Sequence, residues 1–87
     1  MKVENAIKKL KRAGFHVHQQ DNRVSGYNGE WRVSFFDQCG EVTCIWTDDE
    51  YSRKTRDAMT DYFPETYHRN VTQAIEFVKR QAERRDA

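Results

Sequence analysis

The chain has 87 residues, two cysteines, two tryptophans, four tyrosines and five phenylalanines, and its formal net charge at pH 7 is +1. This length predicts a single domain over residues 1–87 with a modest core, because such a chain buries only about 60–65% of its extended surface. Two cysteines exclude a disulfide scaffold, and the lack of roughly 20 consecutive apolar residues excludes a membrane-spanning helix.

The first predicted element is an amphipathic helix over residues 3–13. Its apolar residues recur at helical spacing, and Gly14 follows as the C-terminal stop, because glycine adopts the left-handed conformation that ends many helices. The residues predicted to face the core are Val3, Ala6, Ile7 and Leu10.

Residues 15–47 alternate apolar and polar residues through four short runs, which is typical of half-buried strands. Asn28-Gly29 predicts a tight hairpin turn that pairs Tyr27 with Glu30, because both residues tolerate the positive φ of a type I′ turn. The same counting places Val24 opposite Val33 and Gly26 opposite Trp31. Asp21-Asn22 is predicted to close the preceding turn.

The third turn, over residues 37–40, allows an even or an odd register. The even register, with Phe36 opposite Glu41, gathers nearly all large apolar side chains on one face, so we predict it. Arg32 then points to the opposite face, toward water. The predicted inward residues are Phe15, Val17, Val24, Trp31, Val33, Phe35, Val42, Cys44 and Trp46.

After the fourth strand, residues 48–63 indicate either a loop or a short helix, and Pro64 predicts a turn. A second amphipathic helix is predicted over residues 71–84, with Asn70 as its N-cap and Gln73 completing a capping box. The predicted fold is therefore a two-layer α+β domain. It is a four-stranded antiparallel β-meander with N-terminal and C-terminal helices packed on one face.

Chemistry-bearing motifs are scarce. The spacing of His16, His18, Cys39 and Cys44 matches no standard set of metal ligands, and the predicted register points both histidines away from Cys44. No phosphate-binding glycine loop, calcium loop or activated nucleophile is recognisable. The sequence predicts no metal, no cofactor and no enzymatic activity. Unbridged thiols and an N-terminus without a signal-peptide core predict a soluble, cytoplasmic protein that does not bind membranes.

Charge is unevenly distributed. Residues 1–36 hold seven basic and three acidic residues, residues 37–65 hold three and eight, and residues 66–87 hold five and three. Basic clusters in the C-terminal halves of the two helices indicate either contact with phosphates or an acidic partner, or compensation of the helix dipoles. The small net charge of the chain favours compensation of the helix dipoles. The clusters are Lys8, Lys9, Lys11 and Arg12 on the first helix, and Lys79, Arg80, Arg84 and Arg85 on the last.

The outer face of the predicted sheet carries aromatic and basic residues, as do surfaces that bind partners. Alternatively, the acidic segment or the last helix covers it. The residues predicted to bind a partner are Arg23, Tyr27, Arg32 and Phe36 on the sheet, together with Lys8, Lys11 and Arg12 on the first helix.

Three segments suggest a family: Trp46-Thr47-Asp48-Asp49, Thr60-Asp61-Tyr62-Phe63-Pro64 and Thr72-Gln73-Ala74-Ile75. Over residues 30–80 the chain resembles the large polyvalent protein-associated domains of phage and mobile-element proteins, although the charged stretch from Tyr51 to Met59 departs from their pattern. The resemblance implies a phage, plasmid or bacterial origin and carries no catalytic residues. We therefore expect a small non-enzymatic module that binds another protein, either a host factor or a larger assembly. The alternatives are nucleic-acid binding through the outer sheet face and the basic first helix, and an enzyme of unknown reaction.

Overall fold

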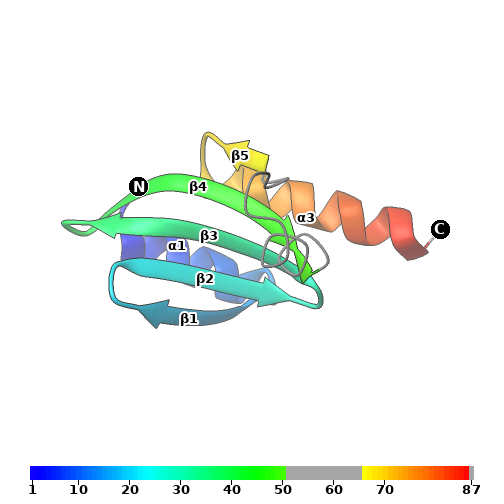
Figure 1. The fold of residues 1–87 in the computed structure, drawn as a ribbon, viewed down its shortest axis with the longest axis horizontal. Coiled ribbons are helices and arrows are strands. Elements are labelled where there is room, and N and C mark those ends of the chain that lie inside the picture. Colours follow the sequence, from blue (N-terminus) through cyan, green and yellow to red (C-terminus); the bar gives the residue numbers. More distant parts are fainter. Residues whose placement is uncertain (51–65, 87) are drawn as a thin grey trace, which may run out of the picture.

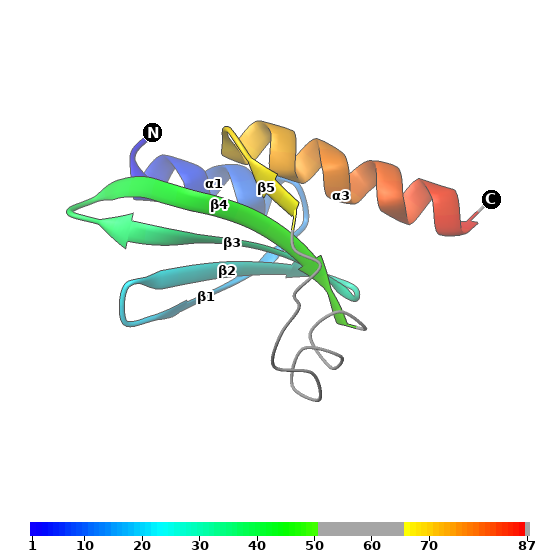
Figure 2. The ribbon, with the colours of Figure 1, turned by 45° about the horizontal axis from the view of Figure 1, so that its top comes forward.

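The computed structural model describes residues 1–50 and 66–86, with side chains described as far as residue 83. The α+β class and the antiparallel meander are confirmed, but the described sheet has five strands rather than four, in the order β1-β2-β3-β4-β5. Both described helices cover one face of this sheet (Figures 1 and 2). The elements are α1 (Val3–Arg12), β1 (His16–Gln20), β2 (Arg23–Asn28), β3 (Trp31–Gln38), β4 (Glu41–Asp49), β5 (Thr66–His68) and α3 (Val71–Asp86).

The additional strand, β5, pairs with β4. The turn predicted at Pro64 lies outside the described residues. Three residues are too few for a recognisable alternation of apolar and polar side chains, so no strand could be predicted there. The prediction of a loop or short helix falls largely on residues 51–63, which lie outside the described residues, while Asp48 and Asp49 continue β4.

Helix α1 ends in a Schellman motif, which confirms the predicted glycine stop. The Phe15 N–H donates to the Leu10 carbonyl at 3.0 Å, and the Gly14 N–H donates to the Lys11 carbonyl at 3.1 Å. Gly14 adopts a φ of 91°, which a side chain would strain. Leu10 and Phe15 are both buried in the core, as the hydrophobic contact of this motif requires.

The β2–β3 turn differs from the prediction. Asn28 pairs with Trp31, and the turn consists of Gly29 and Glu30, so Val24 lies opposite Phe35 instead of Val33. The pairing is displaced by two residues, and because side chains alternate with a period of two, every residue keeps its predicted face. The first turn at Asp21-Asn22 is confirmed, since Gln20 pairs with Arg23.

The β3–β4 pairing contains a β-bulge that the sequence did not predict. Near the turn Phe36 lies opposite Thr43, which is two residues beyond the predicted partner, Glu41. On the other side of the bulge Ser34 lies opposite Trp46, so the register there is shifted by one further residue. One extra β4 residue is accommodated there, and Cys44 has a φ of 52°. The side chains of β4 beyond the bulge therefore point to the faces opposite to those predicted.

The bulge makes part of the predicted interior wrong. Ile45 and Thr47 face the helices, whereas Cys44 is exposed and Trp46 lies on the opposite face from Trp31. The remaining predicted inward residues are confirmed as core or as partly buried residues packed against it. The buried cluster consists of Val3, Ala6, Leu10, Phe15, Val24, Val33, Phe35, Ile45, Val71, Ala74, Ile75 and Val78.

Gly26 allows α1 to approach the sheet closely. It pairs with Val33, so the prediction that it lies opposite Trp31 is wrong. A Cβ atom at Gly26 would lie 3.2 Å from Leu10 Cδ1 and 3.4 Å from Phe15 Cβ. The missing side chain thus provides the space that Leu10 fills.

Helix α3 begins as the sequence predicts, with Asn70 as its N-cap. The Gln73 N–H donates to Asn70 Oδ1 at 2.8 Å. The Gln73 side chain reaches one residue further back than the capping box requires, because its Oε1 accepts from the Arg69 N–H at 3.2 Å.

Candidate functional site

The outer face of the sheet, opposite the helices, follows from the strand register. Its rows are His16, Tyr27, Arg32 and Asp48; His18, Ser25, Ser34, Trp46 and Tyr67; and Gln20, Arg23, Phe36 and Thr43.

Arg32 is not available to a partner, which corrects the prediction that it faces water. Its side chain is buried against Asp48, with Nε donating to Oδ1 at 2.9 Å and Nη2 donating to Oδ2 at 2.5 Å. Burial lowers the pKa of Arg32, but the interactions with Asp48 and, to a lesser degree, with Tyr27 outweigh this effect, so the pKa is raised. This pairing depends on the β4 bulge. No glycine marks the bulge, so the ion pair could not be predicted from the sequence.

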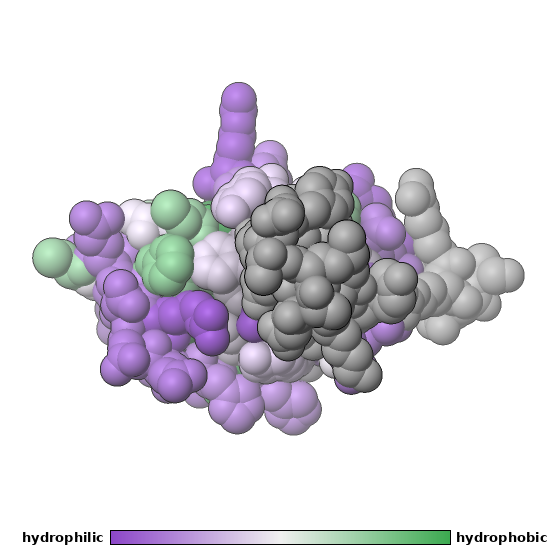
Figure 3. Space-filling view, viewed as in Figure 1, coloured by the Kyte–Doolittle hydropathy of each residue, from purple (hydrophilic) through white to green (hydrophobic). Residues whose placement is uncertain are grey.

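The aromatic patch, which we define as Phe36, Cys44, Trp46 and Tyr67, lies on the same face. These residues line a shallow pocket of about 280 Å³. The rings of Phe36 and Trp46 have centroids 5.2 Å apart, and Tyr67 on β5 is 68% exposed. Figure 3 shows this face, where green hydrophobic residues gather over the left half of β3 and β4. Of the patch, the sequence predicted only Phe36.

The other predicted site residues do not share one surface. Arg23 lies beside the aromatic patch, because it pairs with Phe36 and lines a neighbouring hollow with it. Tyr27 is half-buried beside His18, with ring centroids 5.7 Å apart. Lys8, Lys11 and Arg12 are exposed on α1, in the helix layer.

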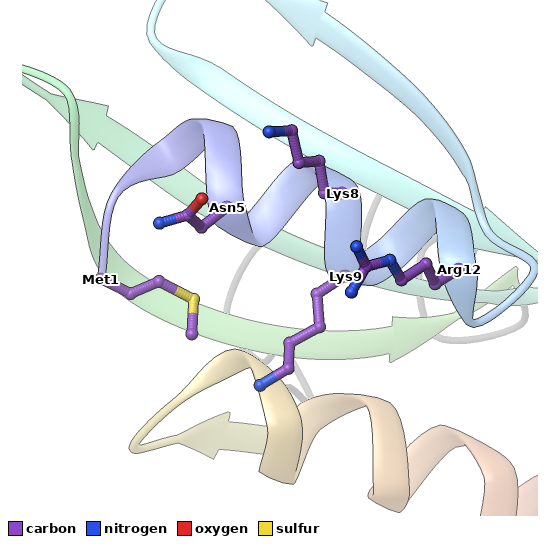
Figure 4. Close-up of a pocket in the computed structure, with 5 residues that line it drawn as sticks. All are labelled: Met1, Asn5, Lys8, Lys9 and Arg12. Atoms are coloured by element: carbon purple, nitrogen blue, oxygen red, sulfur yellow. The ribbon is translucent and has the colours of Figure 1, made fainter.

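A second surface lies in the helix layer and consists of one hollow on α1 and an adjoining hollow between α1 and α3; we call the two together the helix groove. Met1, Asn5, Lys8, Lys9 and Arg12 line its first hollow, of about 330 Å³ (Figure 4). Lys9 and Arg12 continue into a second hollow of about 300 Å³ with Ala13, Thr72, Ile75, Glu76 and Lys79. Lys9 Nζ donates to Thr72 Oγ1 at 2.6 Å, which links the two helices. The structure therefore brings together basic residues that lie far apart in the sequence.

His68 on β5 is a half-buried titratable group. Its Nε2 lies 2.9 Å from Thr47 Oγ1, and its ring centroid lies 5.1 Å from that of Phe77. Burial, and to a lesser degree the charge of Arg80, lowers the pKa of His68. The folded protein thus favours the neutral imidazole.

We expect the free energy of unfolding to decrease as the pH falls below about 6.5, the usual histidine pKa. Below that pH the unfolded chain binds a proton at His68 more readily than the folded chain does, which favours unfolding. The stability that neutral His68 contributes is therefore lost progressively until the pH has fallen through the lowered pKa of the folded state. Urea denaturation from about pH 7.5 to pH 5.2 measures this decrease in stability. Over this pH range the Glu41 carboxylate, whose pKa Lys2 lowers, stays ionised, so its titration does not add to the change. His68→Gln should show a smaller decrease, and parallel curves would contradict the assignment.

No group of three His, Cys, Asp or Glu side chains in residues 1–50 and 66–83 is arranged to hold a metal ion. Neither helix of the described chain is long and apolar enough to cross a membrane. Comparison of the chain with protein-family models, curated proteins and solved structures gives no match.

Proposed function

We propose that the protein is a small binding module that engages another protein through the aromatic patch. The observation that supports this most directly is Tyr67, a large aromatic side chain that is 68% exposed beside an open pocket lined by Phe36 and Trp46. Tryptophan, tyrosine and phenylalanine are enriched at protein interfaces, and the strongest contributions to binding come from such anchors.

The arrangement of the patch supports a protein partner further. Trp46 is buried and its ring lies against Phe36, so the floor of the pocket is rigid and a partner loses little entropy in ordering it. Arg23 at the margin supplies a positive charge beside the apolar centre, an arrangement typical of interfaces with an apolar core and a polar rim. β5 lies at the edge of the sheet, next to the patch.

The resemblance to phage and mobile-element domains indicates the kind of partner. A host factor, or a subunit of a larger phage or plasmid assembly, fits a module that contributes a surface and no chemistry. Arg32 has no role in this proposal, because it is buried in its ion pair with Asp48.

Affinity capture with quantitative mass spectrometry tests the proposal. Wild type, the double variant Phe36→Ala/Tyr67→Ala and the control His16→Ala are compared as baits, because His16 is exposed on the same sheet face at the opposite edge. We expect a discrete partner with wild type and with the control, and its loss with the double variant.

The captured partner is then purified and its Kd measured. Loss of two anchoring rings should weaken binding roughly 30-fold or more, since each anchor contributes more than about 1 kcal/mol. Capture that is unchanged by Phe36→Ala/Tyr67→Ala would reject the patch. Recovery of no specific protein, together with demonstrated turnover of a substrate, would reject the function.

A further inference from the structure

We infer that the helix groove is a second binding site, which takes the phosphodiester backbone of a nucleic acid without reading its sequence. The groove lies in the helix layer, on the other side of the sheet from the aromatic patch, so this site does not depend on the proposed function.

The groove concentrates positive charge from both helices. Lys8, Lys9 and Arg12 of α1 line one hollow, and Lys9 and Arg12 continue into the next, where Lys79 of α3 joins them. Lys8 and Arg12 are one helical turn apart, so their side chains share a flank of α1. Glu76 is the acidic residue that lines the second hollow.

Compensation of the helix dipole does not account for this arrangement. It explains Lys9 and Arg12, which lie in the last turn of α1. It does not explain Lys8, which precedes that turn, or Lys79, which lies in the middle of α3. Among the described residues, Lys8, Arg12 and Lys79 form no ion pair, whereas Lys2 is paired with Glu41 at 2.8 Å.

The ammonium group of Lys9 is held in a position where it can bind an anion. Its hydrogen bond to Thr72 holds the ammonium between the helices and leaves two of its three N–H donors for a ligand. Arg12 lines both hollows with Lys9, whereas Lys8 lines only the α1 hollow and Lys79 only the hollow between the helices. Such a group of cations matches a row of phosphates, each of which carries a full negative charge.

The lining favours nucleic acid over an acidic protein. Protein interfaces depend on buried aromatic anchors, and no aromatic residue lines either hollow of the groove. The same lack of aromatic rings removes base stacking, so contact is limited to the backbone and binding should not depend on sequence.

Fluorescence anisotropy with two labelled DNA duplexes of unrelated sequence, at several salt concentrations, tests the inference. The variant Lys8→Gln/Arg12→Gln/Lys79→Gln should weaken binding of both duplexes roughly tenfold or more at low salt, and each lost contact should reduce the salt slope by about 0.9. Glu76→Gln should strengthen binding by roughly threefold, because it removes the opposing charge from the groove.

The control Lys11→Gln/Arg69→Gln/Arg80→Gln changes the net charge equally but leaves the lining of the groove intact. It should bind DNA much more tightly than the groove variant. Equal weakening by both triple variants, or no measurable binding by wild type at low salt, would overturn the inference. Equal competition by polyglutamate would also overturn it and indicate an acidic protein ligand. Circular dichroism of all variants checks that each is folded.

Discussion

Replacing Arg32 by alanine should destabilise the fold by about 3–5 kcal/mol, because it removes the positive charge that compensates the buried Asp48 carboxylate. The Arg32 side chain is 5% exposed and that of Asp48 is 2% exposed, and two hydrogen bonds join them. At about 0.05–0.15 kcal/mol per residue, the whole domain has roughly 4–13 kcal/mol of stability, so this loss is a large share of it. Urea denaturation at pH 7 measures the loss, and the melting temperature should fall by roughly 12 °C or more.

Two comparisons identify the cause. Arg23→Ala removes the same charge from the same sheet face at a half-buried position, and should cost about 0.5 kcal/mol or less. The apolar double variant Arg32→Met/Asp48→Val should be more stable than Arg32→Ala, because neither charge remains to be desolvated. If Arg32→Ala is no more costly than Arg23→Ala, the pair is solvated and contributes little.

Side chains alternate between the two faces of a sheet, and this alternation, or parity, explains why most of the core could be predicted. None of the predicted residue pairs between β2 and β3 or between β3 and β4 was correct. Both turn predictions were displaced by two residues, and an even displacement leaves each side chain on its face. Phe35 is therefore buried in the core as expected, although it takes the place opposite Val24 that was predicted for Val33.

The candidate site could not be predicted in the same way, because it begins where the parity changes. The bulge at Cys44 moves Trp46 to the outer face and brings Asp48 opposite Arg32. Bulges often use a glycine in the left-handed conformation, and Cys44 adopts this conformation without being glycine. Tyr67 was missed because β5 is short and pairs across a long sequence separation. Lys8, Lys9, Arg12 and Lys79 were recognised as basic residues, but only the packing of α1 on α3 shows that Lys79 shares a hollow with Lys9 and Arg12.

Leu10→Ala should have the second large effect, a loss of about 2–5 kcal/mol, because Leu10 is fully buried and its removal leaves a cavity against the sheet. Gly26→Val should also destabilise, by about 1–3 kcal/mol. A Cβ at Gly26 would already lie 3.2 Å from Leu10 Cδ1, and the valine methyl groups need the space that Leu10 occupies.

The double variant Leu10→Ala/Gly26→Val should lose less stability than the sum of the two single losses, by about 1 kcal/mol or more. The valine then fills part of the cavity left by Leu10, and a β-branched residue suits the middle of β2 better than glycine. Urea denaturation of all four proteins gives the coupling energy. A parallel cycle with Val78→Ala, a buried α3 residue that is not among the closest neighbours of Gly26, should be additive within about 0.5 kcal/mol. Additivity in the Leu10 cycle would show that Leu10 does not rest on Gly26, and close packing of α1 would then no longer explain a glycine in the middle of this strand.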